Sequence, residues 1–167
     1  MFAANEYVFY GSGGICKIVD IQTAPLKGMP EDCQYYVLHS VNDQSSVMYV
    51  PVESDRIFLR ALMTREEAEN LLGGISDIPP IDESNAKLLR ERYNECMHRY
   101  APAEWVRVIK TVCRRAKLIK PSARRLSDTE RGFYESAKRF LCTELSLCLD
   151  ISVAQAEATV RRFVDLL

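Results

Sequence analysis

The chain has 167 residues, of which 47% are hydrophobic and 27% are charged, so it can bury a core and has the composition of an ordinary globular protein. No apolar run approaches the ~20 residues of a membrane span, and the N-terminus lacks a basic-then-apolar signal pattern, so we expect a cytoplasmic protein with no membrane role. The net charge is −1, but residues 1–83 carry 5 Lys/Arg against 13 Asp/Glu and residues 84–167 carry 17 against 10. This asymmetry suggests that the second half meets a polyanion and the first half a different partner.

The cysteines and histidines give no sign of a reactive centre. None of the six cysteines forms a CxxC pair, and no histidine lies at ligand spacing from any of them, so we expect apolar core cysteines, no metal and no cofactor. His39 and His98 have no nucleophile or acidic partner at motif spacing. We therefore expect a binding protein and not an enzyme.

The first two predicted strands are joined by a glycine-rich turn. Residues 8–10 and 15–21 have extended character, and residues 11–14, Gly-Ser-Gly-Gly, form a tight turn that accepts positive φ. Alternation along the second strand places Ile15, Lys17, Val19 and Ile21 on one face.

Residues 35–51 are the most informative stretch. Two extended runs, 35–41 and 47–50, are joined by a polar turn of Asn, Asp, Gln and Ser. Pro51 lacks an N–H, so it marks the place where the second strand ends or reaches the edge of a sheet. Because this second run is apolar on both faces, it needs cover from the rest of its own barrel or from another protein.

A short helix closes the first part of the chain. Thr64 and Glu67 form a capping box, and Gly73 with Gly74 is a helix-ending signal. Short strands closed by one helix predict an α+β chain in which residues 1–74 form a small Tudor-like antiparallel β-barrel. Residues 75–83, which contain Pro79 and Pro80, are predicted to be an extended linker.

Residues 84–167 are predicted to form an all-helical domain. Ser84 or Asn85 caps its first helix, and Pro102 begins the second. On that second helix the inward positions are Trp105, Ile109, Val112 and Ala116, and the opposite side carries Lys110, Arg114 and Lys117. Ser127 with Glu130, and Ser152 with Gln155, are capping boxes that open the last two helices.

The basic residues of the helical part lie mostly between Lys87 and Arg139, where 15 Lys/Arg face 6 Asp/Glu. Most of them are arginine, whose guanidinium group binds phosphate in a bidentate way. This favours contact with nucleic acid over a surface that is only solubilising.

Two groups of residues together resemble a known family. Residues 7–21, 26–28, 35–38 and 47–53 are similar to the RNA-polymerase-interacting domain of the CarD/CdnL family, a domain shared with the bacterial transcription-repair coupling factor. Residues 88–97 and 124–147 resemble the C-terminal domain of the same family. The helicase motors of the coupling factor are absent from this chain.

The resemblance implies a regulator of transcription initiation, and we expect it to be a monomer. It implies that an edge strand adds to the β subunit of bacterial RNA polymerase, and that the helical domain contacts upstream promoter DNA, largely independently of sequence, to stabilise the open complex. The polymerase-binding residues implied are Ile15, Val47, Met48, Tyr49, Val50 and Pro51. The DNA-binding residues implied are Leu89, Arg90, Arg92, Asn94, Arg124, Arg125, Arg131 and Lys138.

This sequence departs from the family pattern at two places. Relatives carry a tryptophan wedge four residues before the tyrosine that matches Tyr93, so Leu89 takes that position, either as a wedge or as core. Relatives carry arginine where this chain has Ala24 and Tyr49, which makes the predicted polymerase contact more apolar. The alternative functions are a protein–protein adaptor whose basic helices do not bind DNA and an RNA-binding Tudor-like module.

Overall fold

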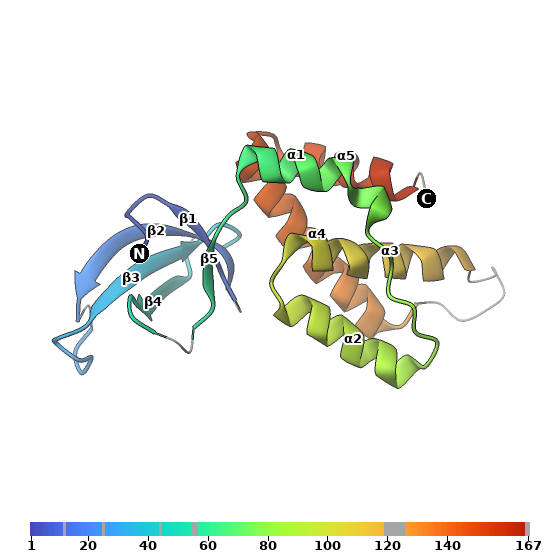
Figure 1. The fold of residues 1–167 in the computed structure, drawn as a ribbon. Coiled ribbons are helices and arrows are strands. Elements are labelled where there is room, and N and C mark those ends of the chain that lie inside the picture. The colour runs from blue at the N-terminus through green and yellow to red at the C-terminus, as the bar shows by residue number, and fades with distance from the viewer. Residues whose placement is uncertain (12, 25, 44, 55–56, 119–125, 166–167) are drawn as a thin grey trace. The chain divides into compact units, whose positions relative to one another are not determined.

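The computed structural model describes the chain except residues 12, 25, 44, 55–56, 119–125 and 166–167. The chain divides into two compact units, Met1–Leu62 and Met63–Leu167. The first is built from strands and the second from helices (Figure 1), which confirms the predicted α+β class with a helical C-terminal part.

The strand unit is one antiparallel sheet in the order β4-β3-β2-β1-β5. Its strands are β1 (Tyr7–Tyr10), β2 (Gly14–Thr23), β3 (Gln34–Ser40), β4 (Val47–Pro51) and β5 (Leu59–Ala61). The predicted barrel closure is wrong, because the sheet of the described residues is open and has two edges. β5 has only three residues and pairs with β1, while β4 pairs with β3.

The turn between β1 and β2 requires its glycines. Gly14 has φ of 72°, a conformation that L side chains rarely adopt. A Cβ atom on Gly13 would lie 2.5 Å from the Tyr10 ring. These two glycines let Tyr10 pair directly with Gly14 at the end of the hairpin.

One face of the sheet carries a compact apolar core. Its buried members are Val8, Cys16, Ile18, Tyr36, Leu38 and Val50. The register between β2 and β3 shifts between Ile18 and Asp20, which leaves Val19 as an extra residue. This bulge brings Ile21 opposite Tyr36 and onto the core face, so the strict alternation predicted for β2 is wrong beyond Val19.

The helical unit contains five α-helices and one short 3₁₀ helix among its described residues. They are α1 (Arg65–Gly73), η1 (Ile75–Asp77), α2 (Ala86–His98), α3 (Pro102–Leu118), α4 (Asp128–Leu149) and α5 (Val153–Asp165). Capping boxes start α1 at Thr64 and α4 at Ser127, and Asn85 caps α2 through its side chain, as the sequence predicts. The Ser152 and Gln155 pair also forms at the start of α5.

The position of α1 differs from the prediction. The sequence placed a domain of residues 1–74 before a linker at 75–83 and a second domain at 84–167, but α1 belongs to the helical unit. The Met63 amide donates to the buried Glu144 carboxylate at 2.9 Å, and Arg65 donates to the Leu149 carbonyl at 2.9 Å. These bonds hold the start of α1 against α4.

The core of the helical unit follows most of the predicted inward positions. Trp105, Ile109 and Val112 on α3 are buried, whereas Ala116 near the end of that helix is exposed. Lys110 is only 6% exposed, so its predicted place on the solvent side of α3 is wrong. The physical reason is that its amine donates to the carbonyl oxygens of Ile75, Ser76 and Ile78.

Candidate functional site

β4 is an edge strand of the sheet (Figure 1). It contains five of the residues predicted to bind a partner, Val47 to Pro51. Met48 and Val50 face Leu38 and Tyr36 across the pair and pack in the core. Val47 is 43% exposed on the opposite face, which it shares with the half-buried Tyr49.

The register fixes which backbone groups of β4 point away from the sheet. The Val52 amide donates to the Gln34 carbonyl, and the Ser40 amide donates to the Ser46 carbonyl, so the even-numbered residues of β4 bond to β3. In an antiparallel pair the alternate residues direct their N–H and C=O groups to the other side. The N–H and C=O groups of Val47 and Tyr49 therefore point to the free edge, the side of β4 on which no described strand pairs.

Pro51 occupies the next outward position on β4. Its missing N–H costs no ladder hydrogen bond there, which is why proline is tolerated at this place. No residue from Val47 to Val50 carries a charge. Natural sheets protect open edges with charges, prolines or bulges, and β4 has only the proline at its end.

Ile15 does not lie beside this edge. It belongs to β2, which β3 separates from β4, and its carbonyl accepts from the Val41 amide at 3.0 Å. The side chain is 1% exposed. The prediction that Ile15 adjoins the contact strand is therefore wrong, and the edge is made by β4 alone.

Leu89 on α2 is core. It is 2% exposed and shares the buried face of the helix with Tyr93 and Cys96. Its neighbour Leu88 is 45% exposed. A wedge has to reach the duplex from the surface, so the structure favours the core interpretation of Leu89. The sequence analysis did not single out Leu88 as the exposed leucine of this helix. The helix period could have found it, because Tyr93 and Cys96 set the buried face to include position 89 and exclude position 88.

The predicted polar DNA contacts of α2 lie on two flanks. Arg90 and Arg92 are both exposed but roughly 160° apart around the helix, given 100° per residue. Arg90 shares its flank with Asn94, and Arg92 shares its flank with Leu88, since residues four apart lie on one side. Arg92 also pairs with Glu95 at 2.8 Å, with both side chains more than half exposed.

α4 carries the remaining described candidates. Arg131 pairs with Asp128, and Lys138 pairs with Glu135 at 3.0 Å and lies over the Tyr134 ring. Seven residues separate Arg131 from Lys138, so both lie on one side of the helix. Arg124 and Arg125 fall outside the residues that the structure describes.

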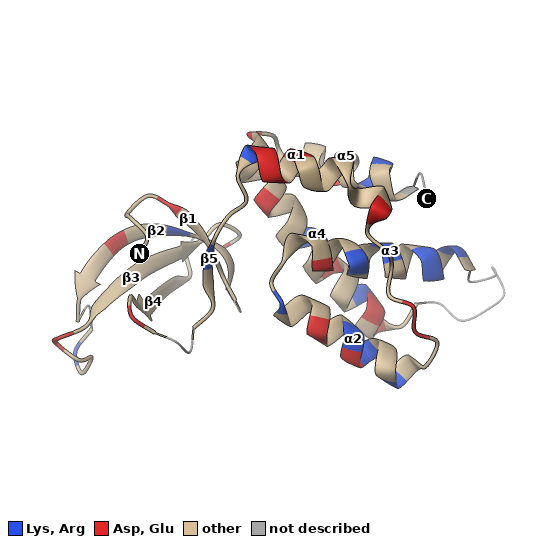
Figure 2. Ribbon diagram, viewed as in Figure 1, with Lys and Arg blue, Asp and Glu red and all other residues tan. Residues whose placement is uncertain are grey.

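Among the described residues of the helical unit, basic and acidic side chains lie next to each other and form ion pairs. Figure 2 shows blue and red segments next to each other along α2 and α3. Arg99 and Arg107 both pair with Glu104, and Arg115 pairs with Glu130 at 2.7 Å. Burial raises the pKa of Glu130, but the bonds from Arg115 and Ser127 outweigh it and leave that pKa below its usual range.

A small cavity lies where α2 meets the start of α4. It is about 150 Å³ in volume and is lined by residues that include Arg90, Tyr93, Arg115 and Glu130. The Tyr93 hydroxyl is buried and has no hydrogen-bond partner among the described residues. Burial, with the Glu130 charge adding to it, raises the pKa of Tyr93 to about 12, so this hydroxyl is neutral.

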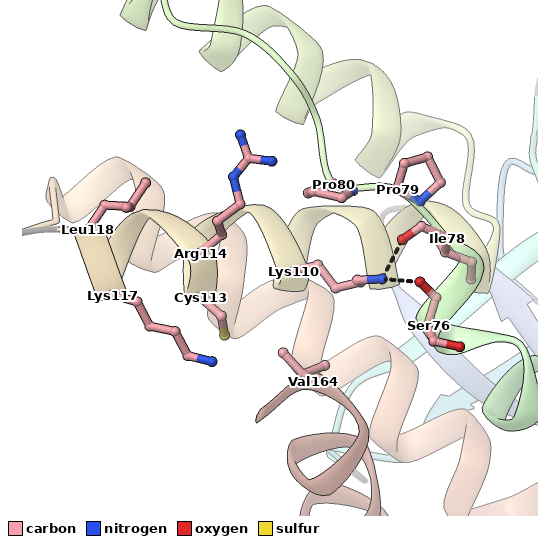
Figure 3. Close-up of a pocket in the computed structure, with 10 residues that line it drawn as sticks. All are labelled: Ser76, Ile78, Pro79, Pro80, Lys110, Cys113, Arg114, Lys117, Leu118 and Val164. Atoms are coloured by element: carbon pink, nitrogen blue, oxygen red, sulfur yellow. Dashed lines mark hydrogen bonds between the residues drawn. The ribbon is translucent and has the colours of Figure 1, made fainter. Parts of the chain in front are cut away.

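The predicted linker is a packed part of the helical unit. The Lys110 amine donates to the carbonyl oxygens of Ile75, Ser76 and Ile78, and Figure 3 shows the bonds to Ser76 and Ile78. The Ile81 amide donates to the Thr111 hydroxyl at 2.8 Å. Ile75 and Ile81 are buried, so residues 75–83 follow α3 and do not form a free tether.

The described residues contain no cluster of three or more His, Cys, Asp or Glu side chains placed to hold a metal ion. The His98 ring contacts the Asn94 carbonyl oxygen through Nδ1 at 2.7 Å.

Across the part of the chain that is described, none of the helices has the length and apolar character to cross a membrane.

Comparison with known families matches both units. Residues 2–63 match the CarD-like/TRCF RID domain, and residues 82–161 match the CarD C-terminal domain. Among curated proteins, no match to this chain was found. The two family matches follow one another along most of the chain, in the same order as the strand unit and the helical unit. The chain belongs to the CarD-like family of RNA polymerase-interacting transcription regulators.

Proposed function

We propose that this protein binds the β subunit of RNA polymerase through the free edge of β4 and contacts upstream promoter DNA through its helical unit, which stabilises the open complex. The observation that carries the first part is the outward direction of the Val47 and Tyr49 backbone groups on an edge strand without charges. This edge lies inside the region that matches the CarD-like/TRCF RID domain.

Strand addition would supply both affinity and selectivity at this edge. Main-chain hydrogen bonds to Val47 and Tyr49 would give affinity, and the side chains of the same two residues would contact the partner on one face of the extended sheet. Tyr49 brings an aromatic surface where relatives have an arginine, so the partner strand is expected to offer an apolar neighbour to that ring and not a carboxylate. Met48 and Val50 would contribute to polymerase binding indirectly, because their side chains pack in the core and hold β4 in the sheet.

The helical unit would act on the DNA backbone and not on base edges. Exposed arginines bind phosphates without reading sequence. On α2 the exposed large apolar residue is Leu88, four residues before Arg92, so one flank offers a cation beside an apolar side chain. An apolar side chain at a base step opposes re-closure of the duplex by an amount on the order of a few kcal/mol per unstacked step.

The experiment that tests docking is co-purification of RNA polymerase with the full-length protein. Tyr49→Pro removes an outward N–H and leaves the bonds between β4 and β3 in place, and Tyr49→Glu adds a charge at the same position. Tyr7→Glu is the control, because it introduces the same charge at another tyrosine, which is 40% exposed but lies on β1 inside the sheet. We expect both Tyr49 variants to lose polymerase and the Tyr7 variant to retain it. Wild-type co-purification by the Tyr49 variants would remove β4 as the docking strand.

A second candidate is a protein–protein adaptor whose helices do not bind DNA. It is favoured by the ion pairs inside the helical unit, in which Glu104, Glu130 and Asp128 neutralise arginines that the sequence assigns to a cationic surface. Mobility shifts on a forked promoter, with and without polymerase, separate the two. A shift of the polymerase–promoter complex that does not depend on the helical arginines supports the adaptor.

A further inference from the structure

A groove lies beside α3 in the helical unit (Figure 3). Its volume is about 410 Å³. One wall is α3 from Lys110 to Leu118, the opposite wall is the segment from Ser76 to Pro80, and Val164 of α5 contributes to the lining. None of the residues predicted to bind DNA or polymerase lines it.

The lining is mostly apolar. Ile78, Pro79, Pro80 and Val164 contribute hydrocarbon surface, and the Cys113 thiol lies between the two ends (Figure 3). Leu118 at the end of α3 is 73% exposed, the highest value among the large apolar side chains of the helical unit that are described. Covering such a surface with an apolar group lowers the free energy, because apolar area is removed from water.

Two cationic side chains border the groove toward the end of α3. Lys117 has no ion-pair partner among the described residues, and Arg114 lies 3.7 Å from Asp82 in a pair that is more than half exposed. An exposed ion pair of this kind contributes little to stability. Another anion can therefore replace Asp82 beside Arg114.

The third cation in the lining, Lys110, has no N–H left to donate to a ligand. Its amine donates to three carbonyl oxygens, of Ile75, Ser76 and Ile78, which uses all of its donors. Asp77 also lies close enough to act on the Lys110 charge. The uncompensated positive charge of the groove is therefore at the Lys117 end and not at the Lys110 end.

The size of the groove decides the class of ligand. Small-molecule sites are concave, mostly apolar, about 300–1,000 Å³ in volume and carry a few polar groups that orient the ligand. A stable protein partner would need roughly 1,000 Å² or more of buried surface, whereas this groove is one concave site lined by ten residues. The observations therefore favour a small molecule over a peptide or a protein.

We propose that this groove binds a small amphipathic carboxylate, with its apolar body along α3 over Cys113 and its carboxylate at Lys117. Seven residues separate Lys110 from Lys117, which gives a groove of roughly 10 Å at 1.5 Å per residue. A straight aliphatic acid of medium chain length fits that distance. This inference is independent of the polymerase and DNA contacts, since it uses a different surface.

The test is a titration of the full-length protein with decanoate, followed by ¹³C-methyl NMR of Ile78, Leu118 and Val164. We expect saturable shifts of these three methyl groups and none at Leu88, which is exposed on α2 away from the groove. Lys117→Gln is expected to weaken decanoate binding about threefold to fivefold, the size of a solvent-exposed ion pair. Lys87→Gln, a matched change of an exposed lysine on α2, should leave the affinity unchanged.

Decanol separates the apolar part of the binding from the charge. It should shift the same methyl groups with an affinity that is equal in the wild type and in Lys117→Gln. Cys113→Leu, which fills the groove, should abolish both titrations in a protein whose melting curve remains cooperative. Absence of saturable shifts with decanoate, or equal decanoate affinity in the wild type and Lys117→Gln, would overturn the proposal.

Discussion

The amine of Lys110 donates a 2.8 Å hydrogen bond to the carbonyl oxygen of Ile75, a residue 35 positions earlier in the chain. Two more carbonyl oxygens, of Ser76 and Ile78, complete its coordination. Burial lowers the pKa of Lys110, with the charge of Asp77 opposing the change. The hydrogen bonds of Lys110 thus hold the segment after α1 against α3.

Substitution of Lys110 should destabilise the helical unit. Lys110→Met keeps the length of the side chain but removes the donor to the Ser76 and Ile78 carbonyl groups and one of two donors to Ile75, at a cost of about 2–3 kcal/mol. We expect a lower midpoint in urea unfolding followed by the fluorescence of Trp105. Lys87→Met, on the exposed side of α2, is the control and should change the midpoint little. An unchanged midpoint for Lys110→Met would show that water replaces the amine without loss.

The ion pair between Arg115 and Glu130 should make stability depend on acidic pH. The pKa of Glu130 is lower in the folded state than its ordinary value of 4.5, so its stabilising contribution is complete above pH 4.5 and is lost as the pH falls through the folded-state pKa. Glu104, whose pKa is also lowered by its hydrogen bonds and arginine partners despite burial, acts in the same direction.

Glu130→Gln isolates this contribution because glutamine can retain the capping box with Ser127 while removing the charge. We expect the variant to be less stable at pH 7 by about 1 kcal/mol and to lose less stability than the wild type below pH 4.5. Glu135→Gln is the control, because it removes the charge of a more exposed carboxylate on the same helix. Thermal unfolding between pH 3 and pH 7 measures both, and identical pH profiles for Glu130→Gln and the wild type would contradict the prediction.

Leu88 and Leu89 should respond to substitution in opposite ways. Leu89→Ala opens a cavity in the core and should cost about 2–5 kcal/mol in the free energy of unfolding. Leu88→Ser should leave stability nearly unchanged and shorten the lifetime of the promoter open complex. Chemical unfolding and the decay of a fluorescent promoter bubble with polymerase measure the two effects. A Leu88→Ser protein that stabilises the bubble at the wild-type level would exclude this residue as the wedge.

The two arginines of α2 should contribute unequally to DNA binding. Because Arg92 lies on the flank of Leu88 and Arg90 on the other, Arg92→Gln should reduce the slope of log affinity against log salt by about 0.9, the value for one phosphate contact. Arg90→Gln should leave the slope unchanged. Salt titrations of the polymerase–promoter complex with each variant test this, and equal slopes for the two variants would mean that the duplex does not lie along the Leu88 flank.

The sequence by itself determined the local structure. The capping residues Thr64, Asn85 and Ser127 and the turn at Gly13 and Gly14 act through neighbours a few positions away, so their geometry follows from residue type and spacing. Pro51 indicated an edge strand for the same reason, because a missing N–H is a local property that only certain strand positions accept. The family resemblance also came from such local segments.

The tertiary structure decided the features that depend on residues far apart in the chain. Lys110, predicted to face solvent, is buried and bonds to Ile75 in the predicted linker, which is therefore packed against α3. The start of α1 is bonded to α4 through Met63 and Glu144. The tertiary structure also left β4 and β5 as separate edges, and it exposed Leu88 while burying Leu89. The physical reason is that burial and hydrogen bonding depend on which surfaces meet, and a helical or strand period specifies a face without specifying what will cover it.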